Sequence, residues 1–276
     1  MSLRRPLSNV RRLRGLTAGW ISAAFAGAIG AGICAVVLSV SFNVPALGRS
    51  AQEDQEDAQI ARSLATMLQA SRTVISKAQD RINDPNGGDK GIDGKMVLAQ
   101  ASALYHGATE TNPAAIDPNS LHGRLIRMQM DSIAEVMDVH QETINRQGVG
   151  FKGFIPAVFS RLVNEAFGRR AKGVAAMKVT APSHLLRNPQ VKPDEWELDA
   201  IATKLQSPSW PKDQPYSAAA PADGALAERT VFPEYYGSSC LACHGSPKGE
   251  IDITGFPKEG AGEGDLAGVI SITIYR

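Results

Sequence analysis

A long stretch without charge near the N-terminus constrains the fold of this 276-residue chain more than any other feature. No charged residue occurs from Gly15 to Gly48, and roughly residues 17–42 are dominated by Ala, Gly, Ile, Val, Leu and Phe. A helix needs about 20 apolar residues to cross the hydrocarbon core of a bilayer. The stretch therefore predicts one membrane-spanning helix.

The charges on either side of this stretch predict its orientation. Five arginines and no acid lie within the first fourteen residues, whereas the segment after the stretch begins Arg49-Ser50-Ala51-Gln52-Glu53-Asp54. Basic residues accumulate on the cytoplasmic side of a membrane. We therefore expect residues 1–48 to form a cytoplasmic stub and an anchor in the bacterial inner membrane. Residues 49–276 would then be one periplasmic domain.

A cleaved signal peptide is the alternative interpretation of the same segment. Ala46-Leu47-Gly48 resembles the small-residue site at which such peptides are cut. The apolar region of a signal peptide is typically about 7–15 residues long, which is much shorter than the stretch seen here. An uncleaved anchor is favoured, and both interpretations export the same domain.

Periodic apolar residues predict helices in the first part of the exported domain. Steps of three and four predict one helix over 60–82, which ends at the turn residues 83–88. The same spacing predicts a second helix over 121–145 and a third from Ile155 to about Arg170. Pro156 suits the first turn of the third helix, where a missing N–H costs little.

Beyond residue 172 the pattern changes to short segments of β-branched and aromatic residues. Strands are expected at 176–180, 228–232 and 268–275. Helices that come first and strands that come later are typical of an α+β domain with an antiparallel sheet. The sequence shows no internal repeat and no low-complexity linker, so one exported domain is expected.

The segment Cys240-Leu241-Ala242-Cys243-His244 contains two of the three cysteines, and Cys34 lies in the apolar stretch. Cys-x-x-Cys-His is the attachment sequence of c-type haem. Two thiols three positions apart reach both vinyl groups at one porphyrin edge, and the adjacent His244 then lies beneath the iron as the proximal ligand. The motif predicts one covalent haem c, bound by Cys240, Cys243 and His244.

Two other interpretations of the cysteine pair have less support. A thioredoxin-like redox centre normally follows a strand in a βαβ unit. Here Gly237-Ser238-Ser239 precedes the motif and Gly245-Ser246-Pro247 follows it. A structural zinc needs four ligands, and the sequence has no second cluster of Cys and His.

The sequence leaves the sixth iron ligand open. His140 stands out because it falls on an otherwise apolar helical face, a position that equally suits a core histidine. An open or water-bound site is the alternative; it favours gas binding, whereas six-coordinate haem favours electron transfer. The other nitrogen and sulfur candidates are His106, His122, His184, Met130 and Met137.

The haem propionates need cationic or hydrogen-bonding partners. Arg187, beside Asn188-Pro189, and Lys248, just after the motif, are the candidates. Solvated surface charge is the alternative interpretation of both residues.

Several segments stand in a fixed order along the chain: Gly153–Phe159, Leu186–Glu197, Pro233–Tyr236, the Cys-x-x-Cys-His motif and Gly264–Ile272. Together they resemble the segments of one known family. That family comprises the single-haem, c-type, PAS-like periplasmic domains, which occur as free-standing small cytochromes and as the sensing part of bacterial kinases and chemoreceptors. The resemblance covers about residues 55–276 and implies a PAS-like antiparallel sheet flanked by helices, with His244 as the proximal ligand.

Charge and organisation favour one function over the others. The net charge of +1 gives no reason to expect nucleic acid as a partner. A transmembrane receptor needs a cytoplasmic output domain, and we expect none because only about fourteen residues precede the predicted span. We therefore favour a membrane-anchored cytochrome in electron transfer, with a redox partner protein or a membrane complex. The alternatives are a haem-based redox or gas sensor that acts through a separate partner protein, and a thiol oxidoreductase. No catalytic constellation accompanies the motif, so we do not expect an enzyme.

Overall fold

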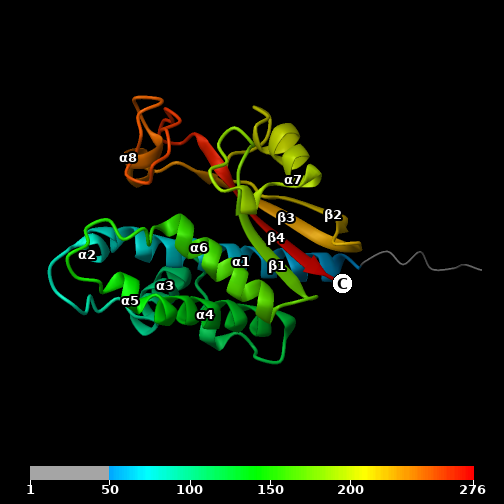
Figure 1. Ribbon diagram of the computed structural model, residues 1–276. Helices are drawn as coiled ribbons and strands as arrows, with labels where there is room; N and C mark the ends of the chain where they lie inside the picture. The colour runs from blue at the N-terminus through cyan, green and yellow to red at the C-terminus, as the bar shows by residue number, and fades with distance from the viewer. Residues whose placement is uncertain (1–49) are drawn as a thin grey trace, which may run out of the picture. The chain divides into compact units, whose positions relative to one another are not determined.

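The computed structural model describes residues 50–276, so the predicted membrane helix lies outside the described residues. Between residues 50 and 276, no helix has both the length and the apolar character that spanning a bilayer requires. The described part is α+β, with helices and an antiparallel sheet, as predicted (Figure 1).

Six helices form a layer on one face of the sheet (Figure 1). The apolar faces of the longer helices, with residues such as Ile60, Leu125 and Phe159, build the main core. The helices are α1 (Ala51–Lys77), α2 (Gln79–Asn83), α3 (Gly94–Thr109), α4 (Leu121–Val139), α5 (Gln141–Ile144) and α6 (Pro156–Arg170).

Two of the predicted helix boundaries differ from the observed ones, and a capping box explains the first difference. The Ser50 hydroxyl accepts a hydrogen bond from the Glu53 N–H, and the Glu53 carboxylate accepts one from the Ser50 N–H. This capping box starts α1 well before the apolar periodicity begins. The predicted second helix breaks at His140, which ends α4 and precedes the short α5.

The sheet has four antiparallel strands in the order β1-β4-β3-β2. β4 is central and pairs with both β1 and β3. β2 is an edge strand, which suits its Pro221 because that residue has no N–H to donate. The strands are β1 (Ala175–Thr180), β2 (Tyr216–Ala222), β3 (Ala225–Tyr235) and β4 (Leu266–Tyr275).

Both faces of the central strand are covered, which explains its nearly continuous apolar sequence. Ile270, Ile272 and Ile274 are fully buried in the main core with α1 and α6. On the opposite face, Val269 packs in a small second core with Val231 and Ile201. That face is covered by α7 (Glu195–Asp199) and by the π-helical turn Ala200–Leu205 that continues it.

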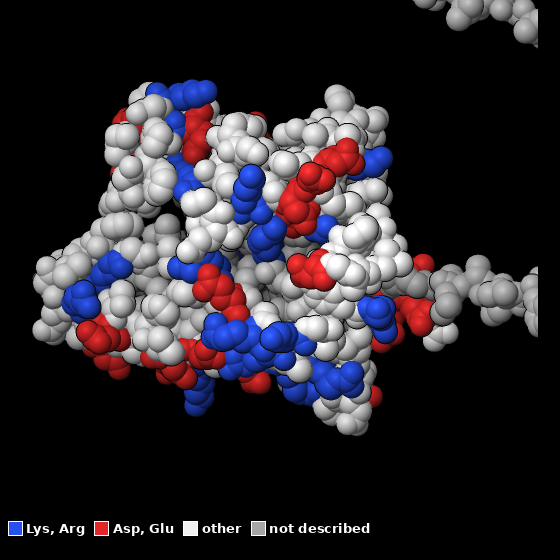
Figure 2. Space-filling model, turned by 45° about the vertical axis from the view of Figure 1, so that its right-hand side comes forward, with Lys and Arg blue, Asp and Glu red and all other residues white. Residues whose placement is uncertain are grey.

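Residues 236–265, called the motif lobe below, connect β3 to β4 and contain α8 (Leu241–His244). The lobe lies beyond the end of the sheet where β3 ends and β4 begins (Figure 1, orange). Figure 2 shows the surface hollowed between this lobe and the helices beneath it. The predicted attachment motif therefore belongs to a lobe that borders a hollow.

Candidate haem site

The motif folds as two consecutive tight turns. A 3₁₀ turn, Ser238–Cys240, leads directly into the single turn of α8. Gly245 ends α8, and its N–H donates to the Leu241 carbonyl at 2.9 Å. A Cβ at Gly245 would lie 2.6 Å from that oxygen, so the turn after the motif accepts only glycine without rearrangement.

Residues 260–264 of the motif lobe hold the motif through backbone hydrogen bonds. The N–H of Ala261 donates to the His244 carbonyl at 2.9 Å, and that of Gly260 donates to the Gly245 carbonyl at 3.1 Å. The N–H of Gly264 donates to the Tyr236 carbonyl at 2.8 Å. The residues on both sides of the cysteine pair are therefore fixed by main-chain contacts.

His244 is held in one orientation by a carboxylate. Its Nδ1 lies 2.8 Å from Oε2 of Glu259. Burial alone would raise the pKa of Glu259, but hydrogen bonds from Arg187 and His244 lower it below its usual value. An ionised carboxylate only accepts hydrogen bonds, so Nδ1 of His244 carries the proton. In the neutral ring the lone pair is then on Nε2, the nitrogen left to bind a metal.

Arg187 joins four parts of the motif lobe. Its Nε and Nη2 donate to the two oxygens of Glu259 at 2.8 and 2.9 Å. Nη1 donates to Asp252 at 2.6 Å, and Nη2 also donates to the Cys243 carbonyl at 2.8 Å. The guanidinium carbon lies 5.5 Å from the centre of the Phe256 ring. Burial alone would lower the pKa of Arg187, but the hydrogen bonds and negative charges of Glu259 and Asp252 raise it, so the side chain stays charged.

Cys240 and Cys243 are free, half-buried thiols. Burial raises the pKa of Cys243, and the nearby carboxylate of Asp252 raises it further. Reactive cysteines in redox enzymes have the opposite character, with a lowered pKa near a helix N-terminus or a cation. Because α8 has four residues, it also offers little helix dipole to the pair.

The residues of the motif fit a c-type haem. They offer two thiols with no disulfide between them and a histidine whose Nε2 is available. A carboxylate on the other ring nitrogen is the usual support of a metal-binding histidine. Within residues 50–276, no group of three or more His, Cys, Asp and Glu is placed to hold a metal ion by itself. A structural zinc would need such a group.

His140 lies at the junction of α4 and α5 instead of on a continuous helical face. Its Nδ1 lies 2.8 Å from the Val136 carbonyl, and its ring is 5.2 Å from that of Phe154. The carbonyl can only accept, so Nε2 is again the unprotonated nitrogen. Within the described residues, no hydrogen bond, ion pair or ring contact joins His140 to the motif. Its role as distal ligand stays a prediction.

The other predicted ligands have varied environments. His106 and His184 are exposed. His122 is half-buried, and its Nε2 has no hydrogen-bond partner among residues 50–276; burial lowers its pKa. Met137 is fully buried in the main core, and the partly buried Met130 packs against this core.

The two predicted propionate partners differ from each other. Arg187 is paired with Glu259 and Asp252 inside the motif lobe, so it is not a free surface cation. Lys248 is exposed, as an ordinary surface lysine would be. Sequence alone did not identify Glu259 and Asp252. They follow the motif in a glycine-rich segment whose spacing gives no signal for their contacts.

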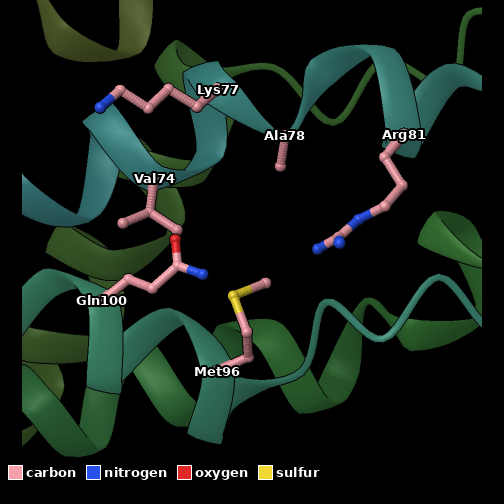
Figure 3. A pocket seen from close by; sticks show the side chains of 6 residues that line it. All are labelled: Val74, Lys77, Ala78, Arg81, Met96 and Gln100. Carbon is pink, nitrogen blue, oxygen red and sulfur yellow. The ribbon is translucent and has the colours of Figure 1, made fainter.

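A pocket of about 230 Å³ lies among α1, α2 and α3 (Figure 3). Its lining contains neither cysteine nor histidine, although Figure 3 shows the sulfur of Met96 pointing into it. Pockets that enclose drug-sized ligands measure roughly 300–1,000 Å³, so this one is small for a haem. The lining residues are Val74, Lys77, Ala78, Arg81, Met96 and Gln100.

The fold and the site together define a class of protein: an α+β domain that carries a c-type haem motif between two strands of an antiparallel sheet. The model of the Tll0287-like family matches residues 50–274. The chain therefore belongs to the Tll0287-like family, a cytochrome c-type, PAS-like family whose membership implies haem c binding. Searches among curated proteins and among solved structures gave no match.

Proposed function

We propose that this protein is a membrane-anchored, monohaem c-type cytochrome that transfers electrons on the periplasmic side of a bacterial inner membrane. One haem is bound covalently through thioether bonds to Cys240 and Cys243, with Nε2 of His244 as the proximal ligand. The segment 1–48 anchors the domain, and a redox partner protein or a membrane complex exchanges electrons with it.

One observation carries the proposal. Two free thiols and an oriented histidine occupy one short turn of the chain, and Glu259 leaves Nε2 of that histidine available. A haem attached there would lie along the hollow beside the motif lobe (Figure 2). Family membership supports the same cofactor.

The chain's own residues have distinct parts in this function. When bound, the haem supplies an iron that gains and loses one electron. The two thiols tether it, and the backbone contacts of the motif lobe keep the tether rigid. Tyr236 and Glu259 fix the plane of the His244 ring. A protein that only transfers electrons needs no further catalytic group.

A thiol oxidoreductase is less well supported. Such an enzyme needs a thiolate as nucleophile, usually activated at a helix N-terminus, whereas α8 has only four residues. Cys240 ends a 3₁₀ turn. The strands before and after the cysteine pair, β3 and β4, are antiparallel, so the pair does not lie in a βαβ unit.

The test is expression of the full chain with and without haem-maturation factors, followed by mass measurement after denaturation. Wild type should gain the mass of one haem, and C240S/C243S should gain none. Cys34→Ser is the matched control, because it removes the cysteine outside the motif and should leave the haem in place. A wild-type chain without bound haem would overturn the proposal.

Optical spectra with and without carbon monoxide separate electron transfer from sensing. An electron carrier with two axial ligands should bind carbon monoxide slowly or not at all. Rapid binding to the reduced protein would contradict electron transfer as the main function and favour the gas-sensor alternative.

A further inference from the structure

We propose that Glu259 and Arg187 together set the redox potential of the haem through the imidazole of His244. Glu259 acts by accepting the ring's N–H, and Arg187 acts by positioning Glu259 and offsetting its charge. This inference rests on the proposed function, because it concerns the same haem.

The first step is the contact between Glu259 and His244. The two side chains meet at 2.8 Å, and both are largely removed from solvent. A ring N–H that donates to a carboxylate makes the other nitrogen a stronger electron donor. A stronger donor stabilises ferric iron relative to ferrous iron, so this contact lowers the midpoint potential.

The second step is the ion pair between Arg187 and Glu259. The two side chains form a bidentate pair, with Nε and Nη2 on the two carboxylate oxygens. This geometry fixes the plane of the carboxylate as well as its position. Because Nδ1 of His244 contacts Oε2 of Glu259, the orientation of the carboxylate plane determines whether the ring N–H points at a lone pair of that oxygen.

The third step is the local balance of charge. Two carboxylates, Glu259 and Asp252, share the one guanidinium of Arg187. The Asp252 side chain is fully buried, so water does little to screen these charges. Removing Arg187 would leave both carboxylates without a counter-charge beside the ligand, whereas removing the charge of Glu259 would leave Arg187 and Asp252 as a balanced pair.

The opposite signs make the proposal testable by potentiometric titration of the full-length holoprotein. Glu259→Gln, which keeps the shape, should raise the midpoint potential. Arg187→Gln, which removes the counter-charge of two carboxylates, should lower it. Arg187→Lys keeps that charge but loses the two-point contact with Glu259, so it should not lower the potential. General damage to the site would move the potentials of Glu259→Gln and Arg187→Gln in the same direction.

Two exposed residues of the motif lobe provide matched controls. Glu250→Gln and Lys248→Gln remove the same charges from the lobe surface and should leave the potential close to that of wild type. An unchanged potential in Glu259→Gln, or equal shifts in these controls, would overturn the inference.

A measurement on the apoprotein covers variants that do not retain haem. Nitrogen-15 NMR of the neutral His244 ring should show the proton on Nδ1 in wild type and on Nε2 in Glu259→Ala. A proton on Nε2 in wild type would overturn the inference whatever the haem content. Absence of haem from the wild type, with the proton on Nδ1, would instead overturn the proposed function.

Discussion

The ring of Tyr236 lies 4.9 Å from the ring of His244, centre to centre, with 34° between the two planes. Tyr236 is 5% exposed and follows directly after β3. The aromatic side chain at the end of the sheet thus supports the predicted haem ligand from one side, while Glu259 holds its Nδ1.

Tyr236→Ala should destabilise the domain and loosen the His244 ring. Loss of a buried aromatic ring costs about 3 kcal/mol in the free energy of unfolding, which urea denaturation measures. We also expect a lower yield of holoprotein.

Tyr236→Phe is the control for that substitution. Burial and the negative charge of Glu259 raise the pKa of Tyr236 to about 12, so its hydroxyl is neutral near pH 7 and phenylalanine keeps the packing. Equal stability of the Ala and Phe variants would contradict a supporting role for the ring.

His140→Ala tests the distal-ligand prediction. If Nε2 of His140 is the sixth ligand, its removal should convert the low-spin absorption spectrum of the oxidised protein to a high-spin one. His106→Ala, which removes an exposed histidine of α3, should leave the spectrum unchanged. An unaltered spectrum in His140→Ala would remove this residue from the ligand set.

Asp252 should make the stability of the domain depend on acidic pH. Burial alone would raise the pKa of Asp252, but hydrogen bonds from Thr254, Arg187 and the Phe256 N–H hold it far below its ordinary value. The unfolded value is roughly 3.9. The contribution is therefore complete above about pH 4 and is lost as the pH falls through lower values towards the folded-state pKa.

Asp252→Asn should lose about 2 kcal/mol at neutral pH, because a buried charged hydrogen bond is removed. Between about pH 5 and pH 3 its stability should fall less steeply than that of wild type. Urea denaturation at both pH values measures the difference, with Glu250→Gln as the exposed control. Parallel losses in wild type and Asp252→Asn would contradict the assignment.

The sequence predicted the α+β class because its apolar periodicities are strong where elements are long or doubly buried. β4 is an example, since Ile270, Ile272 and Val269 fill both faces of the sheet. α3 was not predicted, because its buried residues include small ones such as Gly94 and Ala101 and its apolar pattern is weak. β2 was missed for a similar reason, since its alanines and Pro221 lack β propensity.

Only the residues of the candidate site that are adjacent in the sequence could be predicted. Cys240, Cys243 and His244 are adjacent in the chain, so a motif finds them. The contact of Glu259 with His244 depends on how the motif lobe folds back on itself. The contact of Arg187 with Glu259 joins a segment before β2 to a segment after β3. The sequence identified Arg187 as a candidate cation near the haem. It did not predict that Glu259 and Asp252 pair with this arginine.

The central position of β4 also affects the order in which the chain can fold. Since β4 lies between β1 and β3, the sheet cannot close until residues 266–275 are available to pair. The cysteine pair at 240 and 243 is synthesised, and would be exported, before those residues. A growing chain thus presents both thiols while its sheet is still open, so the proposed haem attachment can precede the last step of folding.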